Sequence, residues 1–322
     1  MQYKTERKSF MAKMKNNGAA PFGIRLRRDM KQNWTLYILV LPVLVFYTLF
    51  CYKPMYGAII AFKEYTPKLG ILGSPWVGMK HFQEFISNPY FWRILKNTLW
   101  ISISTLIFSF PAPIILALLI NELKGKWYPK TVQTLSYLPH FISLVVVCSL
   151  IKEFTAQNGV INDFLAMFGI PRQTMLNNPK LFVPVYVASD IWQGIGWGSI
   201  IYLAALTGID QELYEAAEID GAGRWKQTLH VTIPCIMPTV VIMLILRVGG
   251  LMNVGYEKII LLYNPAIYET SDVISSFVYR KGILERSYSY SSAVGLFNSL
   301  INCLLLFGSN WFSRRMNNTS LW

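Results

Sequence analysis

The amino-acid sequence predicts an all-α protein that crosses a membrane several times. Of its 322 residues, 53% are hydrophobic and only 15% are charged, which is more apolar than an ordinary soluble domain. Crossing a bilayer as a helix takes about 20 mostly apolar residues. Stretches of this kind recur along the chain, and six are expected to be spans: 34–51, 98–120, 132–151, 181–207, 235–254 and 292–312. We therefore expect a polytopic membrane protein with six transmembrane helices.

The segment before the first span, residues 1–33, is basic. It has no apolar core of the signal-peptide kind before Trp34, and no small-residue cleavage site follows the next apolar run. We interpret it as a basic, partly disordered tail, followed by an uncleaved first span that ends near Pro54. The remaining residues, 34–322, form the predicted membrane domain.

The distribution of Lys and Arg orients the spans. With six spans both chain ends lie on one side, together with residues 121–131 and 208–234. Sixteen of the thirty Lys and Arg residues fall on that side, although the opposite loops are longer in total. The positive-inside rule therefore places the N- and C-termini in the cytoplasm. We read the net charge of +13 as this topology signal, because no soluble basic domain that could bind nucleic acid is visible.

Long connections join the spans on the other side. Residues 52–97, 152–180 and 255–290 are rich in aromatic and turn-forming residues. Such loops either bind partners or cap the ends of helices, and both interpretations stay open.

The fourth span carries three closely spaced glycines, Gly194, Gly196 and Gly198. Small residues let a neighbouring helix approach closely inside a membrane. Helix packing is the favoured interpretation, and a hinge is the alternative.

The motifs of common enzymes are absent from the sequence. It has no GxxxxGK[ST] phosphate loop, no GxSxG and no HExxH. The three histidines, His81, His140 and His230, are far apart, and the four cysteines lack metal-ligand spacing. We therefore expect no enzyme activity, no metal and no cofactor. Active transport by this protein needs another chain to supply the energy of ATP.

The polar loop 208–234, between the fourth and fifth spans, carries the strongest functional signal. Its first half favours helix, and Ala216 and Ala217 leave the helix surface open to close approach. Gly221 tolerates the left-handed conformation that ends many helices, and Pro234 fits the first turn of the next span. These features predict a helical hairpin that projects into the cytoplasm and meets a partner. The alternative is a helix lying on lipid, which its acidic residues disfavour beside an anionic leaflet.

The loop resembles the EAA loop of the membrane subunits of bacterial ABC importers, through EAAEIDGA at 215–222 and the later Ile233-Pro234. In that family the loop forms the coupling helix, which sits in a cleft of the cytoplasmic ATPase. The resemblance implies that the ATPase contacts Tyr214, Glu215, Ala216, Ala217, Asp220, Gly221 and Ala222. It also implies the type I ABC importer permease fold, in which six helices form half of a translocation pore.

Further stretches resemble the carbohydrate-uptake permeases, in the polysaccharide-type subgroup associated with pectin-derived oligosaccharides. These stretches are 88–102, 136–143, 253–282 and 319–322. The resemblance runs from Trp34 onward, with a core permease region at about 93–312. It implies a multi-pass protein of the bacterial cell membrane, working with a second homologous permease subunit, two cytoplasmic ATP-binding subunits and an extracellular solute-binding lipoprotein. A permease for amino acids or peptides is the alternative.

Two charges inside the predicted spans mark a candidate path for the solute. Counting about 1.5 Å per helical residue, Asp190 and Arg247 lie at the same depth, roughly 10 Å from one membrane surface. Charges inside a membrane pair with one another or line a watery path, and both interpretations stay open. If Arg247 lines such a path, its planar guanidinium group suits a uronate carboxylate. Trp192 and Trp197 would then offer flat faces to sugar rings.

Polar residues elsewhere in the spans predict assembly with another subunit. Asn253, Asn298 and Asn302 would face lipid at a cost in an isolated chain, so we expect the protein to need its partner permease. A membrane enzyme acting on lipid-linked sugars would need a carboxylate or histidine cluster, and a passive channel would need a self-contained pore.

Overall fold

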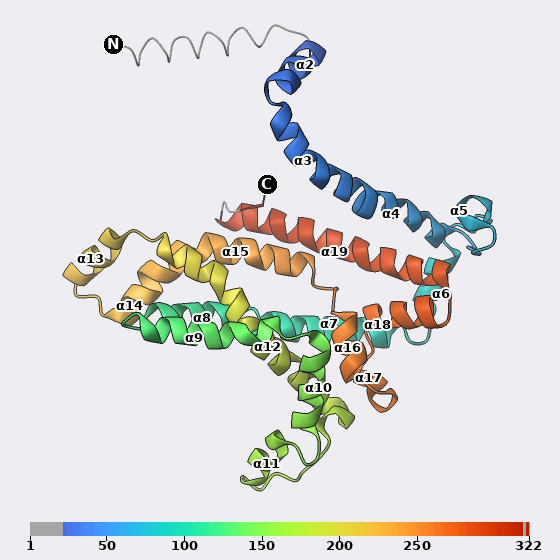
Figure 1. Cartoon of the computed structure of the whole chain (residues 1–322). Helices are drawn as coiled ribbons and strands as arrows, with labels where there is room; N and C mark the ends of the chain where they lie inside the picture. The colour runs from blue at the N-terminus through green and yellow to red at the C-terminus, as the bar shows by residue number, and fades with distance from the viewer. Residues whose placement is uncertain (1–21, 318–319, 322) are drawn as a thin grey trace. The chain divides into compact units, whose positions relative to one another are not determined.

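The computed structural model describes residues 22–317 and 320–321. Within these residues the regular structure is helical, and the only β pairing is an isolated bridge between Lys63 and Trp76. The predicted all-α class is confirmed (Figure 1). The chain divides into two compact units, Met1–Ile59 and Ile60–Trp322, which are described separately.

The first unit contains a helix at the end of the basic tail and most of the first span. The tail residues 1–21 lie outside the described residues. The helical elements are α2 (Phe22–Gln32), α3 (Trp34–Phe46), the π-helical turn η1 (Tyr47–Tyr52), α4 (Lys53–Met55) and the 3₁₀ segment η2 (Tyr56–Phe62). The span from α3 to η2 is 29 residues long and runs past Pro54, where the sequence suggested its end. Proline crowds the carbonyl four residues before it, and the wide turn η1 directly ahead accommodates the ring.

The second unit holds the other helices. Its longer helices are α7 (Phe91–Phe108), α8 (Pro111–Asn121), α9 (Trp127–Tyr137), α10 (Leu144–Thr155), α12 (Pro179–Thr207), α15 (Ile233–Gly249) and α19 (Tyr288–Asn317). Its shorter helices are α5 (Gly70–Gly73), α6 (Lys80–Ile86), α11 (Val160–Ala166), α13 (Gln211–Ile219), α14 (Arg224–Gln227), α16 (Tyr256–Leu262), α17 (Tyr268–Ser271) and α18 (Ile274–Tyr279). Single helical turns connect some of them: η3 (Leu138–Phe141), η4 (Met175–Asn177), η5 (Thr228–Thr232), η6 (Pro265–Ile267) and η7 (Arg280–Leu284).

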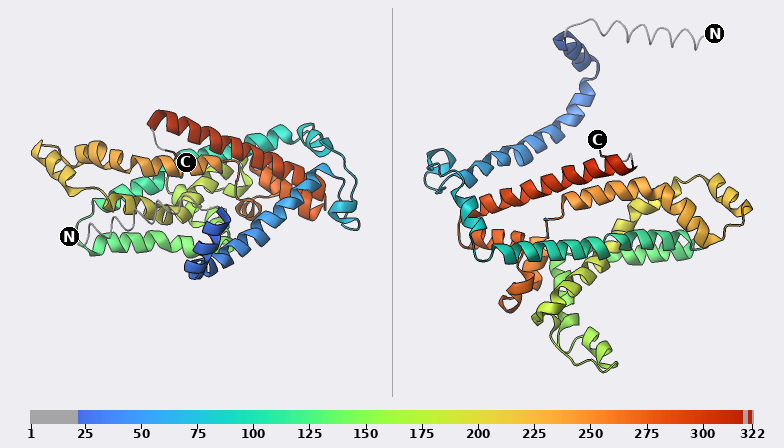
Figure 2. Two further views of the ribbon diagram at one scale, coloured as in Figure 1. Left: turned by 90° about the horizontal axis from the view of Figure 1, so that it is seen from above. Right: turned by 180° about the vertical axis from the view of Figure 1, so that it is seen from behind.

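The long helices of this unit run alongside one another. In Figures 1 and 2, α8, α9, α15 and α19 share one direction, α13 lies at one end of the bundle, and α6 and α18 lie at the other. α10 and α11 project sideways from the bundle on the side opposite α19. We call the two ends of the bundle the α13 end and the α18 end.

Five helical stretches in the described part of the chain are long and apolar enough to cross a membrane. They are Trp34–Phe62, Phe91–Asn121, Leu144–Ala166, Arg224–Gly249 and Tyr288–Arg315. The helix α12 has 29 residues, but Asp190 and Gln193 make its centre more polar. The stretch Arg224–Gly249 joins α14, η5 and α15 into one helix of 26 residues.

The predicted third span, 132–151, is not continuous. α9 ends at Tyr137, the turn η3 contains Pro139, and Ser143 then begins α10 by accepting a hydrogen bond from the Val146 N–H at 3.4 Å. A proline inside a helix and a serine at an N-cap both favour a break. The second half of the predicted span therefore leaves the bundle as α10.

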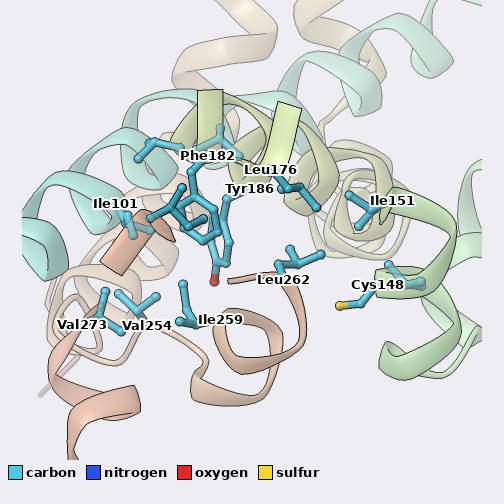
Figure 3. Close-up of a cluster of buried hydrophobic side chains, with 14 residues drawn as sticks. Ile101, Cys148, Ile151, Leu176, Phe182, Tyr186, Val254, Ile259, Leu262 and Val273 are labelled. Carbon is cyan, nitrogen blue, oxygen red and sulfur yellow. The ribbon is translucent and has the colours of Figure 1, made fainter. Parts of the chain in front are cut away.

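Buried side chains gather in three clusters around α7 and α12. The largest cluster, shown in Figure 3, joins α7, α10, α12 and α16, with Phe182 and Ile259 completely buried. A second cluster at the α18 end packs Phe85, Phe91 and Phe277 between α6, α7, α18 and α19. The third joins α8, α12 and α15. α12 contributes to the first and third clusters, so it is the central helix on which the candidate site is built.

Gly196 allows α12 to touch the backbone of α9. A Cβ atom at this position would overlap the Ser136 carbonyl and the Tyr137 nitrogen. At Gly198 a Cβ would press on the Pro113 ring of α8, whereas at Gly194 it would meet nothing within 4 Å. Two of the three predicted small positions are therefore helix contacts within this chain.

We expect Gly196→Ala to destabilise the protein and Gly194→Ala to leave it unchanged or slightly more stable. The first change forces α9 and α12 apart, at a cost of about 1–3 kcal/mol, and the second removes a helix-interior glycine without a clash. Thermal unfolding of the two purified variants should show a Tm lower by roughly 5 °C for Gly196→Ala alone. Equal Tm values would contradict the packing assigned to Gly196.

The three asparagines expected to face lipid bond to one another. Asn298 and Asn302 each donate to Oδ1 of Asn253, at 3.0 and 2.9 Å, and Oδ1 of Asn302 accepts from the Met252 N–H at 2.9 Å. This network ties α19 to the segment after α15. These amide groups therefore find most of their partners inside the chain, but Asn298 Oδ1 is buried without a hydrogen-bond partner among the described residues.

Candidate functional site

Asp190, near the middle of α12, lies between two cations. Its Oδ2 is 3.8 Å from Arg247 Nη2 near the end of α15, and its Oδ1 is 3.8 Å from Lys258 Nζ on α16. The structure thus brings together Asp190 and Arg247, which the sequence placed at one depth. One carboxylate thus faces two cations, and Glu257 adds a second carboxylate to the lining of the cavity beside them.

Sequence reasoning missed Lys258. The residue is only 5% exposed, and its Nζ lies 3.5 Å from the Tyr186 carbonyl oxygen and 4.7 Å from the centre of the Tyr186 ring. A buried ammonium requires such partners because an isolated buried charge is costly. The signal available in the sequence is a lysine within the apolar run Tyr256–Leu262, in a segment that was expected to be a loop.

Two cavities meet at the Asp190–Arg247 pair. The first has a volume of about 420 Å³ and is lined mainly by polar and small residues of α7, α12 and the α15–α16 segment, including Ser102, Thr105, Tyr186, Gln193, Gly250, Asn253, Tyr256 and Lys258. The second has a volume of about 430 Å³ and lies toward the α13 end, with Ser109, Pro113, Gly194, Gly198, Tyr202 and Met243 in its lining. Asp190 and Arg247 line both. The ion pair therefore stands between two spaces that follow one another along α12.

The two tryptophans expected beside Arg247 are not in the lining of either cavity. Trp197 stacks on His140, with ring centres 4.5 Å apart and planes 4° from parallel, and Phe141 meets its ring edge-on. Trp192 is exposed. The aromatic rings at the first cavity are those of Tyr186 and Tyr256.

The loop between α12 and α15 forms a helical hairpin at one end of the bundle. Asp210 caps α13 by accepting a hydrogen bond from the Glu212 N–H at 3.1 Å. The helix ends where Gly221 takes φ +74°, and the Ala222 N–H reaches back to the Ala217 carbonyl at 2.9 Å. This is the closing bond of a Schellman cap, which glycine provides without strain.

Two side-chain contacts fix the hairpin to the long helix Arg224–Gly249. The Tyr214 hydroxyl lies 3.0 Å from Thr232 Oγ1, and Gln227 Nε2 donates to the Ala222 carbonyl at 3.0 Å. The outer surface of the hairpin is uncovered: Glu215, Ala216 and Asp220 are exposed. Ile219 is 87% exposed and Trp225 is 74% exposed. Acidic and large apolar side chains together make a surface suited to a protein partner.

A second charged cluster lies near the α18 end. Asp272 is completely buried and accepts two hydrogen bonds from Arg280, Nη1 to Oδ1 at 3.1 Å and Nη2 to Oδ2 at 2.6 Å. The Ser276 hydroxyl donates a third hydrogen bond to Asp272 Oδ1, at 2.8 Å. Arg93 Nη2 lies 3.8 Å from Asp272 Oδ2. Asn97 of α7 donates to the Asp272 carbonyl at 3.0 Å. The cluster fastens α7 to α17 and α18.

A bundle of membrane-crossing helices, with a charged pair between two internal cavities and an exposed hairpin at one end, defines a membrane transport subunit. Residues 109–318 match the family described as binding-protein-dependent transport system inner membrane component, and the chain belongs to this family. It is therefore a component of a transporter in the inner membrane and not an enzyme.

Curated relatives match nearly the whole chain. Protein LplB of Bacillus subtilis (strain 168) is 42% identical over 300 residues, which cover 93% of this chain and 94% of the relative. The polygalacturonan/rhamnogalacturonan transport system permease protein YteP of the same organism is 41% identical, covering 92% and 93% of the two chains.

A solved structure has the same fold. A bacterial ABC transporter involved in the import of the acidic polysaccharide alginate contains a chain that superposes with a TM-score of 0.84 at 43% identity, covering 91% of this chain and 99% of that one. A second structure shows the alginate transporter in complex with its alginate pentasaccharide-bound periplasmic protein, again with a TM-score of 0.84. The expected ABC importer permease fold is confirmed.

Proposed function

We propose that this chain is the permease subunit of an ATP-driven importer that moves oligosaccharides, including acidic ones, across the cytoplasmic membrane. The observation that carries the proposal is the cluster of Asp190, Arg247 and Lys258 between two cavities. The names of the relatives support it, because polygalacturonan, rhamnogalacturonan and alginate are all polymers that contain uronic acids.

Uronate carboxylates match the charge of the cluster. Asp190 lies 3.8 Å from both cations and Arg247 is half exposed, so a carboxylate of the solute can take the place of Asp190 at Arg247. A guanidinium binds a carboxylate through two parallel N–H groups. Tyr256, whose side chain is exposed, supplies an aromatic ring in the same cavity. Binding at Arg247 would therefore loosen the pair that separates the two cavities.

The energy for transport enters through the hairpin around α13. The resemblance to the EAA loop assigns the ATPase contact to Tyr214, Glu215, Ala216, Ala217, Asp220, Gly221 and Ala222, and the exposed acidic and apolar side chains of the hairpin fit a protein partner. α19 runs from the α18 end toward the α13 end, so the hairpin and the end of α19 share one side, which we assign to the cytoplasm (Figure 1). The positive-inside rule assigns the basic N-terminal segment to the cytoplasm as well.

The complete transporter contains more chains. A second permease subunit supplies the other wall of the path, two ATP-binding subunits drive it, and a binding protein delivers the solute on the far side.

We expect Arg247→Gln to reduce uptake of acidic oligosaccharides by about 10- to 100-fold, because it removes a charge-assisted hydrogen bond of about 1.5–3 kcal/mol. Uptake of neutral oligosaccharides of the same length should fall far less. The assembled transporter in proteoliposomes, loaded with binding protein and ATP, gives both rates.

The surface pair Arg172–Asp163, at 2.6 Å, provides the matched control. Arg172→Gln should leave both uptake rates unchanged. If Arg247→Gln lowers both rates equally, and Asp190→Asn in the same chain restores both, then the Asp190–Arg247 pair serves structure and the proposed selectivity is wrong.

A further inference from the structure

A cavity larger than the two at the Asp190–Arg247 pair has no role in the proposed path. It is a groove of about 1110 Å³ between α7, along its whole length, and the first half of α12, closed on one side by α17. Its lining residues are Trp92, Arg93, Lys96, Asn97, Trp100, Ser104, Phe108, Pro179, Lys180, Val183, Pro184, Val187, Ala188, Ile191, Glu269 and Thr270.

The groove is polar at one end and apolar along the rest of its length. Arg93, Lys96 and Lys180 lie where α7 and α12 begin, and Glu269 is the only carboxylate in the lining. Arg93 is already engaged by Asp272. Lys96 and Lys180 form no ion pair within the described residues. Two lysines are therefore available to bind an anion at this end.

The apolar part of the groove follows the two helices toward the centre of the membrane. On α7 the lining residues recur every four positions from Trp92 to Phe108, and beyond Lys96 the apolar ones are Trp100 and Phe108. On α12 it is formed by Val183, Val187 and similar residues. Tryptophan near the end of a membrane helix is typical of the lipid headgroup level.

On α7 the groove is separate from the first cavity of the path, whereas on α12 Ile191 lines both the groove and the second cavity. On α7 the groove uses positions such as 96, 100 and 104, whereas the first cavity uses Ile101, Ser102 and Thr105. The two sets lie on different faces of the helix, because successive residues are about 100° apart. Ile101, which is 1% exposed, forms part of the wall between them. A ligand of the groove therefore does not occupy the first cavity, where the solute is proposed to meet Arg247.

We propose that this groove binds an anionic phospholipid. Its phosphate is held by Lys96 and Lys180, and one acyl chain lies along Trp100, Val187 and Ala188. Charge complementarity favours this occupant over a zwitterionic lipid, because the groove has two free cations and one carboxylate. An apolar helix of the partner permease would leave both lysines without a partner.

The experiment measures lipid that remains bound to the assembled transporter. The complex is purified from nanodiscs containing equal amounts of phosphatidylglycerol and phosphatidylcholine, and native mass spectrometry counts the lipids retained per complex. We expect phosphatidylglycerol to be retained preferentially. Lys96→Gln with Lys180→Gln should lower its retention at least about tenfold, since two charge-assisted contacts are lost. Ala188→Trp should lower it by filling the acyl-chain part of the groove.

Lysines elsewhere on the chain provide the control. Lys68 and Lys152 are exposed and line none of the cavities described above, so their exchange for Gln should not change retention. The proposal is overturned if the Lys96/Lys180 variant retains phosphatidylglycerol like the wild type, or if both lipids are retained equally. It is also overturned if Ser104→Cys cross-links to the partner permease in high yield, because a helix then fills the groove.

Discussion

Glu215→Lys and Gly221→Val are each expected to abolish transport while the chain still inserts and assembles in the membrane. Glu215 is exposed on α13, so a lysine there reverses the charge of the surface that we assign to the ATPase contact. Gly221 has φ +74°, and a Cβ there would meet nothing within 4 Å. Valine at this position is therefore strained by its backbone alone, at a cost of 1–2 kcal/mol or more, and α13 loses its cap.

Gly223→Val is the matched control for the second change. Gly223 lies two residues away with φ −69°, and its Cβ position is equally open. Solute uptake and solute-stimulated ATP hydrolysis by the reconstituted complex should both be lost in Glu215→Lys and Gly221→Val and kept in Gly223→Val. Uptake at the wild-type rate in the first two variants would refute the coupling assignment.

Asp272→Asn is expected to have the largest effect on stability. The change keeps the shape of the side chain but removes the charge that holds Arg280 and faces Arg93. Removing one partner of a buried ion pair costs about 3–5 kcal/mol, because the other charge stays buried and unpaired. A domain of this size should lose roughly 10 °C in Tm. Thermal unfolding of the purified complex measures the loss.

The exposed ion pair of Asp163 and Arg172 provides the control for the stability effect of Asp272→Asn. Asp163→Asn removes a carboxylate at 2.6 Å from an arginine, but both side chains are about half exposed. Exposed pairs are worth about 0–1 kcal/mol, so the Tm should hardly move. If both variants unfold at the same temperature, the Asp272 cluster does not brace the α18 end.

Local features were predictable from the sequence because each depends on a few neighbouring residues. The end of α13 follows from Gly221, whose left-handed conformation the structure contains. The close approach at Gly196 follows from the absence of a side chain. Pro139 and Ser143 also carried a local signal for the break after α9, but the apolar composition of 132–151 outweighed it in the prediction.

Features that join distant segments were not predictable in this way. Lys258 meets Asp190 across 68 positions of sequence only because α16 folds back onto α12. The Asp272–Arg280 pair is local, but nothing in the sequence shows that α7 and α18 bury it. Trp192 and Trp197 are close to Asp190 in sequence, yet neither lines the cavities at the charged cluster, because a helix turns successive side chains to different sides.

The helical stretch from Arg224 to Gly249, which contains the π-helical turn η5 and Pro238, can act as a lever in the proposed coupling. It begins at the hairpin around α13 and carries Arg247 near its other end. The arm between Arg224 and Arg247 is about 35 Å long at 1.5 Å per residue, so a tilt of about 5° at the hairpin moves Arg247 by roughly 3 Å. Such a displacement breaks an ion pair whose atoms are 3.8 Å apart. Under the proposed coupling, a small rotation at the hairpin is therefore enough to separate Asp190 from Arg247.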